Sequence, residues 1–336
     1  MLQLKNRTQF AAAMALFPDA QGVDTLYAVV KATYRMNPSP EPAETQVPVT
    51  LSDEYWGDPG ASSLRYASEM HLSKPSTDVV LMGQAWVSND RLVDQLDVTL
   101  SVAGRSKVVR ALGTRQWRSG GKISPPEPFE SMPLVYEFAY GGVYVSPSGE
   151  MFAEERNPVG RGFLGGRTEE EWVGQPLPNV EDPRLLLQKP GDVVPPAGFA
   201  FVAPSWLPRR AYAGTYDEAW QKGRAPYLPQ DFDPRFFNAA PADLVFEPFL
   251  SGGESVEILN ASPAGTLRFT LPRGGLRMRV TIAGDVQEPP VHLETVLLEP
   301  DEARLCLTWR AAVPCDKKAL KVEEVVIEAN GPEEAP

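Results

Sequence analysis

Apolar and polar positions alternate along several stretches in the first third of the chain. Residues 25–36 place apolar side chains at every second position, which is the period of a β-strand with at least one buried face. Residues 79–87 form a second β-rich run, and residues 96–102 alternate again. A Gly-Arg turn follows this third run, so we expect residues 107–112 to return as its hairpin partner.

The last third of the chain shows the same period. Residues 267–271 and 276–282 alternate on either side of a Pro-Arg-Gly-Gly stretch, which predicts one hairpin. Residues 292–298 and 303–309 flank Glu-Pro-Asp-Glu and predict a second hairpin.

Residues 119–250 lack a sustained period and predict loops with short helices. Thr168 begins a Thr-Glu-Glu-Glu capping box, and Thr215 begins a second one, Thr-Tyr-Asp-Glu. Asp233 followed by Pro234 is typical of an N-cap with proline at the first helical position. The many aromatic residues predict that this segment packs over the β-structure instead of forming a flexible linker.

These patterns predict a mainly β protein. We expect two packed antiparallel β-rich parts, sandwich-like or barrel-like, joined by a long irregular segment rich in proline and aromatic residues. The expected divisions are an N-terminal β-rich part (residues 1–118), the irregular segment (119–250), C-terminal hairpins packed on the rest (251–328) and a disordered tail (329–336).

Charge and hydropathy limit the partners and the location. Across 336 residues the formal net charge is −12, which argues against nucleic acid and anionic membranes because phosphate contacts need a basic face. No stretch reaches the roughly 20 apolar residues of a membrane span. The run at residues 10–17 follows Lys5 and Arg7 as in a signal peptide, but it is short and half alanine. We expect a cytoplasmic protein, with Cys306 and Cys315 as free thiols.

Residues 195–250 interleave proline, aromatic residues, arginine and aspartate. Each proline restricts the backbone, and rigid aromatic and arginine side chains are what binding surfaces use. The alternative is that the rings fill a satellite core. The candidate partner-binding residues are Trp206, Arg209, Tyr212, Tyr216, Asp217, Trp220, Arg235 and Phe236.

Motifs for cofactors and metals are weak. The glycines at 160–165 have the GxGxxG spacing but neither the preceding strand nor the following helix of a dinucleotide site, so we expect a glycine-rich turn. His71 and His292 are far apart in the sequence, and neither has a local partner for a metal or a nucleophile. We expect no cofactor and no metal.

Paired carboxylates are the remaining route to catalysis, as in glycoside hydrolysis. The irregular segment contains four acids for such a cleft, or for caps and ion pairs with its arginines. The acids are Glu137, Asp182, Asp217 and Asp233, and the arginines are Arg184, Arg209, Arg210 and Arg235.

Several long motifs resemble a bacterial family of unknown function found in type VI secretion gene clusters. The longest is AYAGTYDEAWQKGRAPYLPQDFDPRFFNAAP at residues 211–241. Others, in the family's order, are a VVVKATY-like stretch at 28–34, KPSTDVVLMGQAW at 74–86, EPFESMPLVYEFAYGG at 127–142, ERNPVGRGF at 155–163 and LPNVEDPR at 177–184. The resemblance covers most of the chain.

The resemblance implies a non-enzymatic adaptor or chaperone. Such a protein binds an effector toxin, or a VgrG-like or PAAR-like spike protein, and helps load the effector onto the secretion spike. The expected mechanism is capture of an exposed apolar segment or an unpaired strand edge. The alternatives are a carbohydrate-active enzyme with paired carboxylates and a structural subunit of the apparatus.

Overall fold

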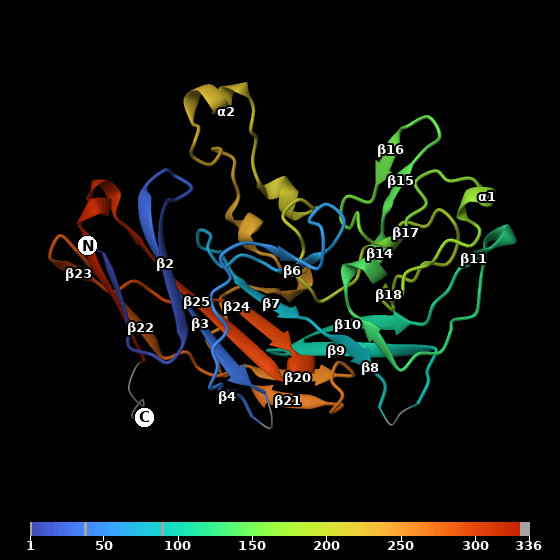
Figure 1. Cartoon of the computed structure of the whole chain (residues 1–336), viewed down its shortest axis with the longest axis horizontal. Helices are drawn as coiled ribbons and strands as arrows, with labels where there is room; N and C mark the ends of the chain where they lie inside the picture. Colours follow the sequence, from blue (N-terminus) through green and yellow to red (C-terminus); the bar gives the residue numbers. More distant parts are fainter. Residues whose placement is uncertain (1, 37–38, 89–90, 330–336) are drawn as a thin grey trace.

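A seven-stranded sheet runs through the middle of the molecule (Figure 1). The computed structural model describes residues 2–36, 39–88 and 91–329. In this sheet only the β7–β24 pair is parallel. In order, its strands are β19 (Val245–Phe246), β7 (Thr77–Leu81), β24 (His292–Glu299), β25 (Arg304–Pro314), β3 (Asp24–Arg35) and β2 (Ala11–Pro18), with β4 (Glu41–Pro42) beside β3.

Two smaller sheets flank the central one. The five-stranded sheet has the order β18 (Val180–Glu181), β10 (Arg105–Leu112), β9 (Gln95–Val102), β20 (Ser255–Leu259) and β21 (Leu267–Thr270). The four-stranded sheet has the order β1 (Gln3–Asn6), β26 (Val322–Ala329), β22 (Leu276–Ile282) and β23 (Asp285–Gln287).

The chain is mainly β, as the alternating patterns predict. The N-terminal and C-terminal β-rich parts do not form two separate units packed together, because strands from both parts pair within the same sheets. β3 pairs with β25, β9 pairs with β20, and β1 pairs with β26. Every sheet in the described ranges is open. None of the described sheets closes into a barrel, so the barrel-like alternative is wrong.

The core has two main clusters of buried side chains. The larger one includes Val79 and Leu81 of β7 and Leu100 of β9. In the second, Leu26, Ala28 and Val30 of β3 pack with residues of β22 and β26, which makes the central and four-stranded sheets a sandwich. Both faces of β3 are therefore covered, and every residue between its two ends is buried.

Two predicted hairpins are confirmed and one is wrong. β9 pairs with β10, and β24 pairs with β25. The strands on either side of Pro-Arg-Gly-Gly do not pair, because β21 joins β20 and β22 joins β26. This stretch crosses the ring of Trp309, where a Cβ on Gly274 would lie 2.7 Å from the indole. The glycine permits a close crossing between two sheets instead of a turn.

The irregular segment consists of loops, short helices and small strand pairs. The helices are α1 (Glu169–Trp172), α2 (Glu218–Gly223) and the 3-10 helices η1 (Ser119–Gly121), η2 (Tyr136–Phe138), η3 (Arg209–Tyr212), η4 (Pro234–Phe237) and η5 (Ala242–Leu244). η6 (Pro300–Glu302) and η7 (Asp316–Lys321) lie nearer the C-terminus. Two of the two-stranded pairs lie wholly within this segment: β14 (Tyr140–Gly141) with β17 (Arg161–Gly162), and β15 (Val143–Val145) with β16 (Met151–Ala153). Two others join it to the preceding chain: β8 (Gln84–Trp86) with β13 (Ser131–Pro133), and β11 (Trp117–Arg118) with β12 (Lys122–Ile123). The pair of β5 (Glu54–Tyr55) and β6 (Leu64–Tyr66) lies before the segment.

The predicted helix starts fit the structure in two cases of three. Thr168 forms the capping box of α1, and Asp233 caps η4 ahead of Pro234. The box predicted at Thr215 is wrong: α2 begins two residues later than that box implies, with Asp217 as its N-cap. The reason is that the amide and hydroxyl of Thr215 both donate to Asp231.

The remaining predictions concern the C-terminal tail, the signal-like run, the cysteines and membrane spans. The chain predicted as a tail from residue 329 lies outside the described residues, except Ala329, which ends β26. The signal-like run forms β2. Cys306 and Cys315 are buried free thiols, as expected. Of the helices described, none has the length and apolar character needed to cross a membrane.

Candidate partner-binding surface

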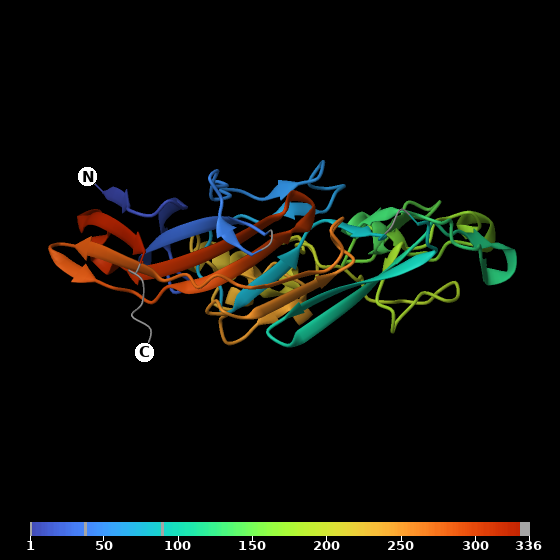
Figure 2. The same ribbon diagram turned by 90° about the horizontal axis from the view of Figure 1, so that it is seen from below.

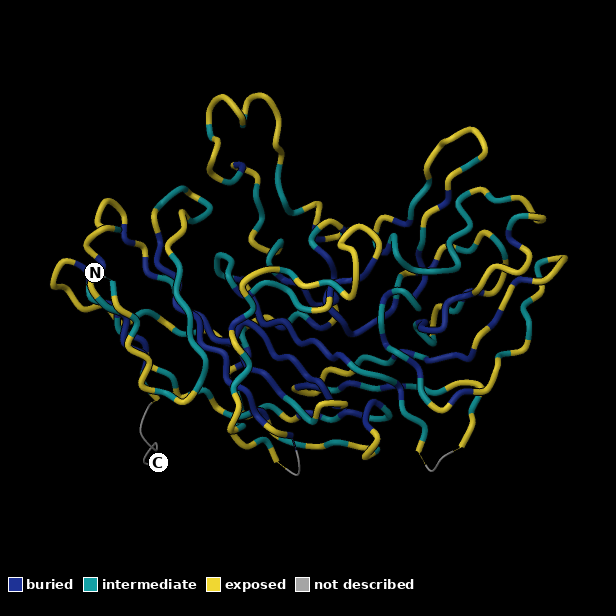
Figure 3. Tube along the Cα trace, in the orientation of Figure 1, coloured by how far each residue is buried: buried dark blue, intermediate teal, exposed yellow. Residues whose placement is uncertain are grey.

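Two projections rise from the same side of the molecule (Figure 1). One carries α2, and we call residues 213–232 the arm. The other is the β15–β16 hairpin. Both are coloured largely as exposed in Figure 3, in contrast to the buried central sheet, and Figure 2 shows that the molecule is thin in the perpendicular direction.

The predicted site residues separate into two groups. Tyr216, Asp217 and Trp220 lie on the arm, and the others lie at its base, in η3 and η4 or just before η3. The base residues are Trp206, Arg209, Tyr212, Arg235 and Phe236.

The innermost base residues serve the fold and are closed to a partner. Trp206 is buried in the main core, with its ring edge-on to Tyr136 at 5.6 Å. Arg209 is also buried, and its guanidinium donates to the carbonyls of Val202 and Phe236. These bonds fix the irregular backbone, which has no strand ladder to satisfy its carbonyls. Trp206 therefore fills the main core and not a satellite core, and Arg209 holds the backbone beside it.

The outer base residues form a local cation-aromatic unit. The guanidinium carbon of Arg235 lies 4.5 Å from the centre of the Tyr212 ring. Asp233 accepts from the amide and the guanidinium of Arg235, and hydrogen bonding to Arg235 lowers the pKa of Asp233. The amide of Asp233 in turn donates to the carbonyl of Tyr212, at 3.0 Å. The unit connects η3 to η4 at the foot of the arm.

The arm is stabilised by its own hydrogen bonds. Asp217 accepts from the amide of Trp220 at 2.8 Å, and the indole of Trp220 donates to the carbonyl of Tyr227 at 2.8 Å. Tyr216 and Trp220 meet edge to face with ring centres 4.7 Å apart, although Tyr216 precedes α2 and its N-cap Asp217. The result is an ordered aromatic pair at the tip of the arm.

The arm also contacts the turn between β2 and β3. Arg224 donates to the carbonyl of Ala20 at 2.6 Å, and the ring of Tyr227 lies against Gly22, where a Cβ would stand 3.4 Å away. Even with these contacts, Tyr216 keeps 53% and Tyr227 42% of its surface exposed. Exposed aromatic rings held in fixed positions supply contact area at low entropic cost.

The β15–β16 hairpin is a second exposed apolar surface, which the sequence analysis missed. Val143, Val145 and Met151 are exposed, and the strand register places them on one face. Tyr144 and Phe152 stack on the other face with ring centres 6.2 Å apart. The signal in the sequence is a pair of apolar triplets, Val-Tyr-Val and Met-Phe-Ala, on either side of Ser-Pro-Ser-Gly-Glu.

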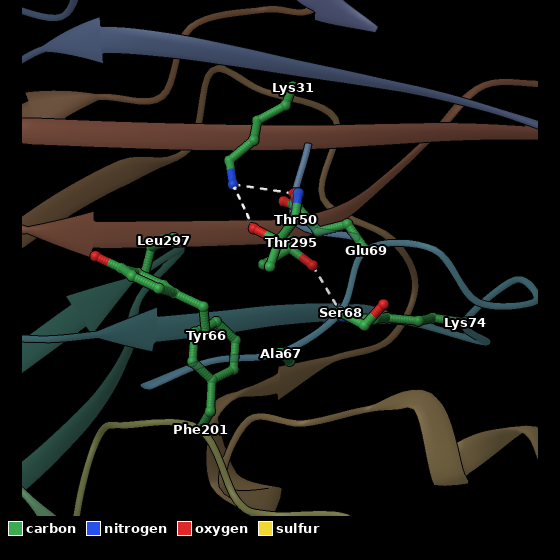
Figure 4. Close-up of a pocket in the computed structure, with 10 residues that line it drawn as sticks. All are labelled: Lys31, Thr50, Tyr66, Ala67, Ser68, Glu69, Lys74, Phe201, Thr295 and Leu297. Atoms are coloured by element: carbon green, nitrogen blue, oxygen red, sulfur yellow. Dashed lines mark hydrogen bonds and ion pairs between the residues drawn. The ribbon is translucent and has the colours of Figure 1, made fainter. Parts of the chain in front are cut away.

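A buried ionic network lies on one face of the central sheet, around a small pocket (Figure 4). It contains three ion pairs between residues that are almost completely buried. They are Lys31–Glu69 at 2.9 Å, Lys74–Asp78 at 2.7 Å and Arg310–Glu294 at 2.6 Å. The network was also missed, because each charge considered alone has the appearance of a solvated surface residue.

The pairs are joined to each other by further hydrogen bonds. Glu69 accepts from Thr308 at 2.6 Å, and its carbonyl accepts from Arg310 at 2.6 Å. Glu294 accepts from the amide of Lys74 at 2.8 Å. Removing a charge from water costs free energy unless the buried charge is paired and hydrogen-bonded in this way. The network therefore joins N-terminal and C-terminal strands.

His71 borders this network as a neutral side chain. Its Nδ1–H donates to the carbonyl of Leu72, and its Nε2 lies 3.3 Å from a guanidinium nitrogen of Arg310. The ring stacks on Phe237 with centres 5.1 Å apart. Burial, followed by the charges of Arg310 and Lys74, lowers the pKa of His71 well below 6.5.

We expect acid to destabilise the fold through His71. Because the folded pKa is lower than the unfolded value, the unfolded chain binds the extra proton, and stability is lost as the pH falls below 6.5. The loss between pH 6.5 and 5.5 is about 1 kcal/mol. Urea unfolding at several pH values measures it. His71→Gln should reduce the dependence of the unfolding free energy on pH. His292→Gln, at an exposed histidine, is the control and should keep the dependence of the wild-type protein. The same pH dependence in the wild-type protein and both variants would contradict the assignment to His71.

The four acids considered for catalysis all accept hydrogen bonds or form ion pairs within the fold. Glu137 accepts from the amide and hydroxyl of Ser63, both at 2.7 Å. Asp182 pairs with Arg184 and Asp233 with Arg235, as the capping and pairing alternative predicts. Two arginines depart from that alternative: Arg210 pairs with Glu155 at 2.9 Å, and Arg209 donates to carbonyls.

The predicted glycine-rich turn is packed against neighbouring chain. Gly162 has φ near +90° and lies where a Cβ would be 2.7 Å from Pro178. A Cβ on Gly160 would lie 2.6 Å from the carbonyl oxygen of Ala139. These glycines allow the short parallel pairing of β14 and β17. Their spacing is explained by packing.

Fold and surface together define a mainly β protein with open sheets and an ordered aromatic arm. A family model described as "Uncharacterized protein conserved in bacteria (DUF2169)" matches residues 21–310, and the chain belongs to this family. No curated protein and no solved structure matches the chain. Membership confirms the bacterial family of unknown function expected from the motifs, and the link to type VI secretion stays a prediction.

Proposed function

We propose that this protein is a non-enzymatic adaptor of type VI secretion, which binds an effector or its spike-tip protein in the bacterial cytoplasm and helps load it onto the spike. The observation that carries the proposal is the arm. It exposes Tyr216 and Tyr227 on a segment fixed at its foot by Thr215 and Asp231 and along its length by Arg224. The motif resemblance supplies the link to secretion.

The geometry of the arm supports binding more than catalysis. Its three acids are all engaged: Asp217 caps α2, Asp231 accepts from the amide and hydroxyl of Thr215, and Glu218 pairs with Lys222. Its exposed surface includes two aromatic rings, Tyr216 and Tyr227. Binding energy in protein interfaces concentrates in a few Trp, Tyr and Arg side chains. The arm presents such side chains already ordered, which lowers the entropic cost of association.

Replacing Tyr216 and Trp220 together by alanine should abolish most of the binding. Each aromatic truncation at an interface centre costs about 2 kcal/mol or more, or about 30-fold in affinity. We expect the fold to lose about 1 kcal/mol or less, because the arm lies outside both main cores. The measurement is the amount of cognate effector released by the native host when the variant replaces the wild-type gene.

The matched control is Trp56→Ala. Trp56 is another exposed aromatic residue, contacted by the guanidinium of Arg65 at 4.6 Å and lying outside the arm. We expect normal effector release with this variant. Normal effector release from a strain that lacks the gene would contradict the adaptor function. If deletion of the gene stops release but the arm variant supports normal release, the partner binds another surface.

A further inference from the structure

β2 is an open edge of the central sheet. It forms eight residue pairs with β3 on one side. Among the described residues, no backbone group of β2 is hydrogen-bonded to any other segment. In an antiparallel pair, every second residue of an edge strand directs its N–H and C=O away from the sheet. This row of donors and acceptors is a template for another strand.

β2 differs from the other edges of the three main sheets. In the part of the chain that the structure describes, β1, β4, β18, β19, β21 and β23 are two to four residues long. All of these except β19 carry a charged residue, as edges protected against pairing usually do. β2 has eight residues, Ala-Ala-Ala-Met-Ala-Leu-Phe-Pro, and none is charged.

The side chains of β2 leave room for an added strand. Ala12 and Met14 pack against the cluster shared with the four-stranded sheet. At the end of the strand, Leu16 is 39% and Phe17 is 38% exposed. Because consecutive residues point to opposite faces, an added strand would find apolar neighbours on both sides of the sheet.

The arm stands at this end of β2. The turn that follows Pro18 is the one contacted by Arg224 at Ala20 and by Tyr227 at Gly22. Figure 1 shows the arm rising beside the β2–β3 turn. An open apolar edge therefore leads directly to the aromatic side chains of the arm.

We propose that β2 accepts an extended, uncharged apolar segment of the partner as an additional strand of the central sheet, with the arm contacting the partner beyond Pro18. Main-chain hydrogen bonds provide affinity in this mode of recognition, and side-chain contacts provide specificity. The inference rests on the adaptor function proposed above, and it specifies the bound segment and the strand that receives it.

Charge favours a foreign segment over a second copy of the chain. The net charge of −12 makes two copies repel each other. The edge itself is neutral, so an uncharged segment meets no opposing charge along its length. A charged side chain in the added strand would be partly removed from water without a partner on β2.

Amide hydrogen exchange tests the inference in the complex. The chain is co-expressed with the effector encoded in the same gene cluster, and complex formation is measured by light scattering. Exchange at residues 11–18 is then compared in the free chain and in the complex. Slower exchange of the outward-facing amides of β2 in the complex is the expected result.

Two variants add a matched comparison. Leu16→Lys places a charge on the open edge and should weaken binding about tenfold or more, because the lysine would be buried unpaired. Val286→Lys places the same charge on β23, where Val286 is exposed, and should leave binding unchanged. Circular dichroism and thermal unfolding confirm that both variants fold.

The outcomes separate this inference from the proposed function. A complex in which β2 exchanges as fast as in the free chain overturns strand addition and leaves the adaptor function intact. A homodimer with protected β2 amides identifies a second copy as the occupant and also overturns the inference. If the chain forms no complex with the effector or with the spike protein of its cluster, the adaptor function fails and the inference fails with it.

Discussion

Replacing Asp78 by alanine is expected to lower the free energy of unfolding by about 3–5 kcal/mol. Asp78 lies on β7 and is completely buried. Its carboxylate accepts from the ammonium of Lys74 and the amide of Ala239, both at 2.7 Å, and from the side chain of Asn238 at 2.9 Å. Without it, the buried ammonium retains only the hydroxyl of Thr295. Urea unfolding followed by circular dichroism measures the change.

The control for Asp78 is an acid in an exposed pair. Glu218 pairs with Lys222, and about three-quarters of each side chain is exposed. Exposed pairs contribute at most about 1 kcal/mol. We expect Glu218→Ala to have a correspondingly small effect. Equal losses in the two variants would contradict the special role of the buried network.

Replacing Arg310 by methionine is expected to cost about 3–5 kcal/mol as well. Arg310 donates to Glu294 and to the carbonyl of Glu69, both at 2.6 Å. Methionine fills similar space but leaves the carboxylate of Glu294 buried beside the sheet without its cation. Thermal and urea unfolding of the variant provide the measurement.

A second substitution separates the charge effect from lost packing. In Arg310→Met combined with Glu294→Gln, the amide oxygen can still accept from the backbone of Lys74, and the unpaired charge is gone. We expect this double variant to recover part of the loss. Arg277→Met, which removes an exposed pair with Glu288, should change stability far less than Arg310→Met does. A double variant less stable than Arg310→Met would contradict the electrostatic explanation.

The network connects the β-core to the arm. Asp78 holds Asn238 and Ala239, which directly follow η4. The carbonyl of Phe236 in η4 accepts from Arg209 at 2.9 Å, and η3 leads into the arm. Because the irregular segment lacks a ladder of its own, these contacts determine where the arm stands. We therefore expect variants of the network to weaken partner binding as well as stability.

Local patterns were sufficient for most of the β-structure. The period of two identified β3, β9 and β25, and turn residues identified the β9–β10 and β24–β25 hairpins. The same reasoning failed at Pro-Arg-Gly-Gly, because the determining contact is the ring of Trp309, about 35 residues away in the sequence. Strand pairing between sheets depends on such distant contacts.

The candidate site could be predicted only in part. The proline- and aromatic-rich stretch at residues 195–250 contains the exposed rings of Tyr216 and Tyr227. Aromatic density alone did not separate these residues from Trp206, which is buried in the main core. Burial depends on which element covers a ring, and a loop-rich sequence does not specify this.

The ionic network had a sequence signal that is clear once the strands are known. Lys31, Asp78, Glu294 and Arg310 each stand beside apolar residues within a strand. A charge within a strand buried on both faces needs a partner. The partners come from strands and loops far away in the sequence, so the pairs themselves follow only from the topology.

Copurification from the native host is the experiment we would do first. The tagged wild-type protein and its Tyr216→Ala, Trp220→Ala variant are isolated from secretion-active cells, and bound proteins are identified by mass spectrometry. We expect the wild-type protein to retain a spike or spike-tip protein together with a toxin domain, and the variant to lose it. Recovery of the wild-type protein alone would contradict the adaptor function.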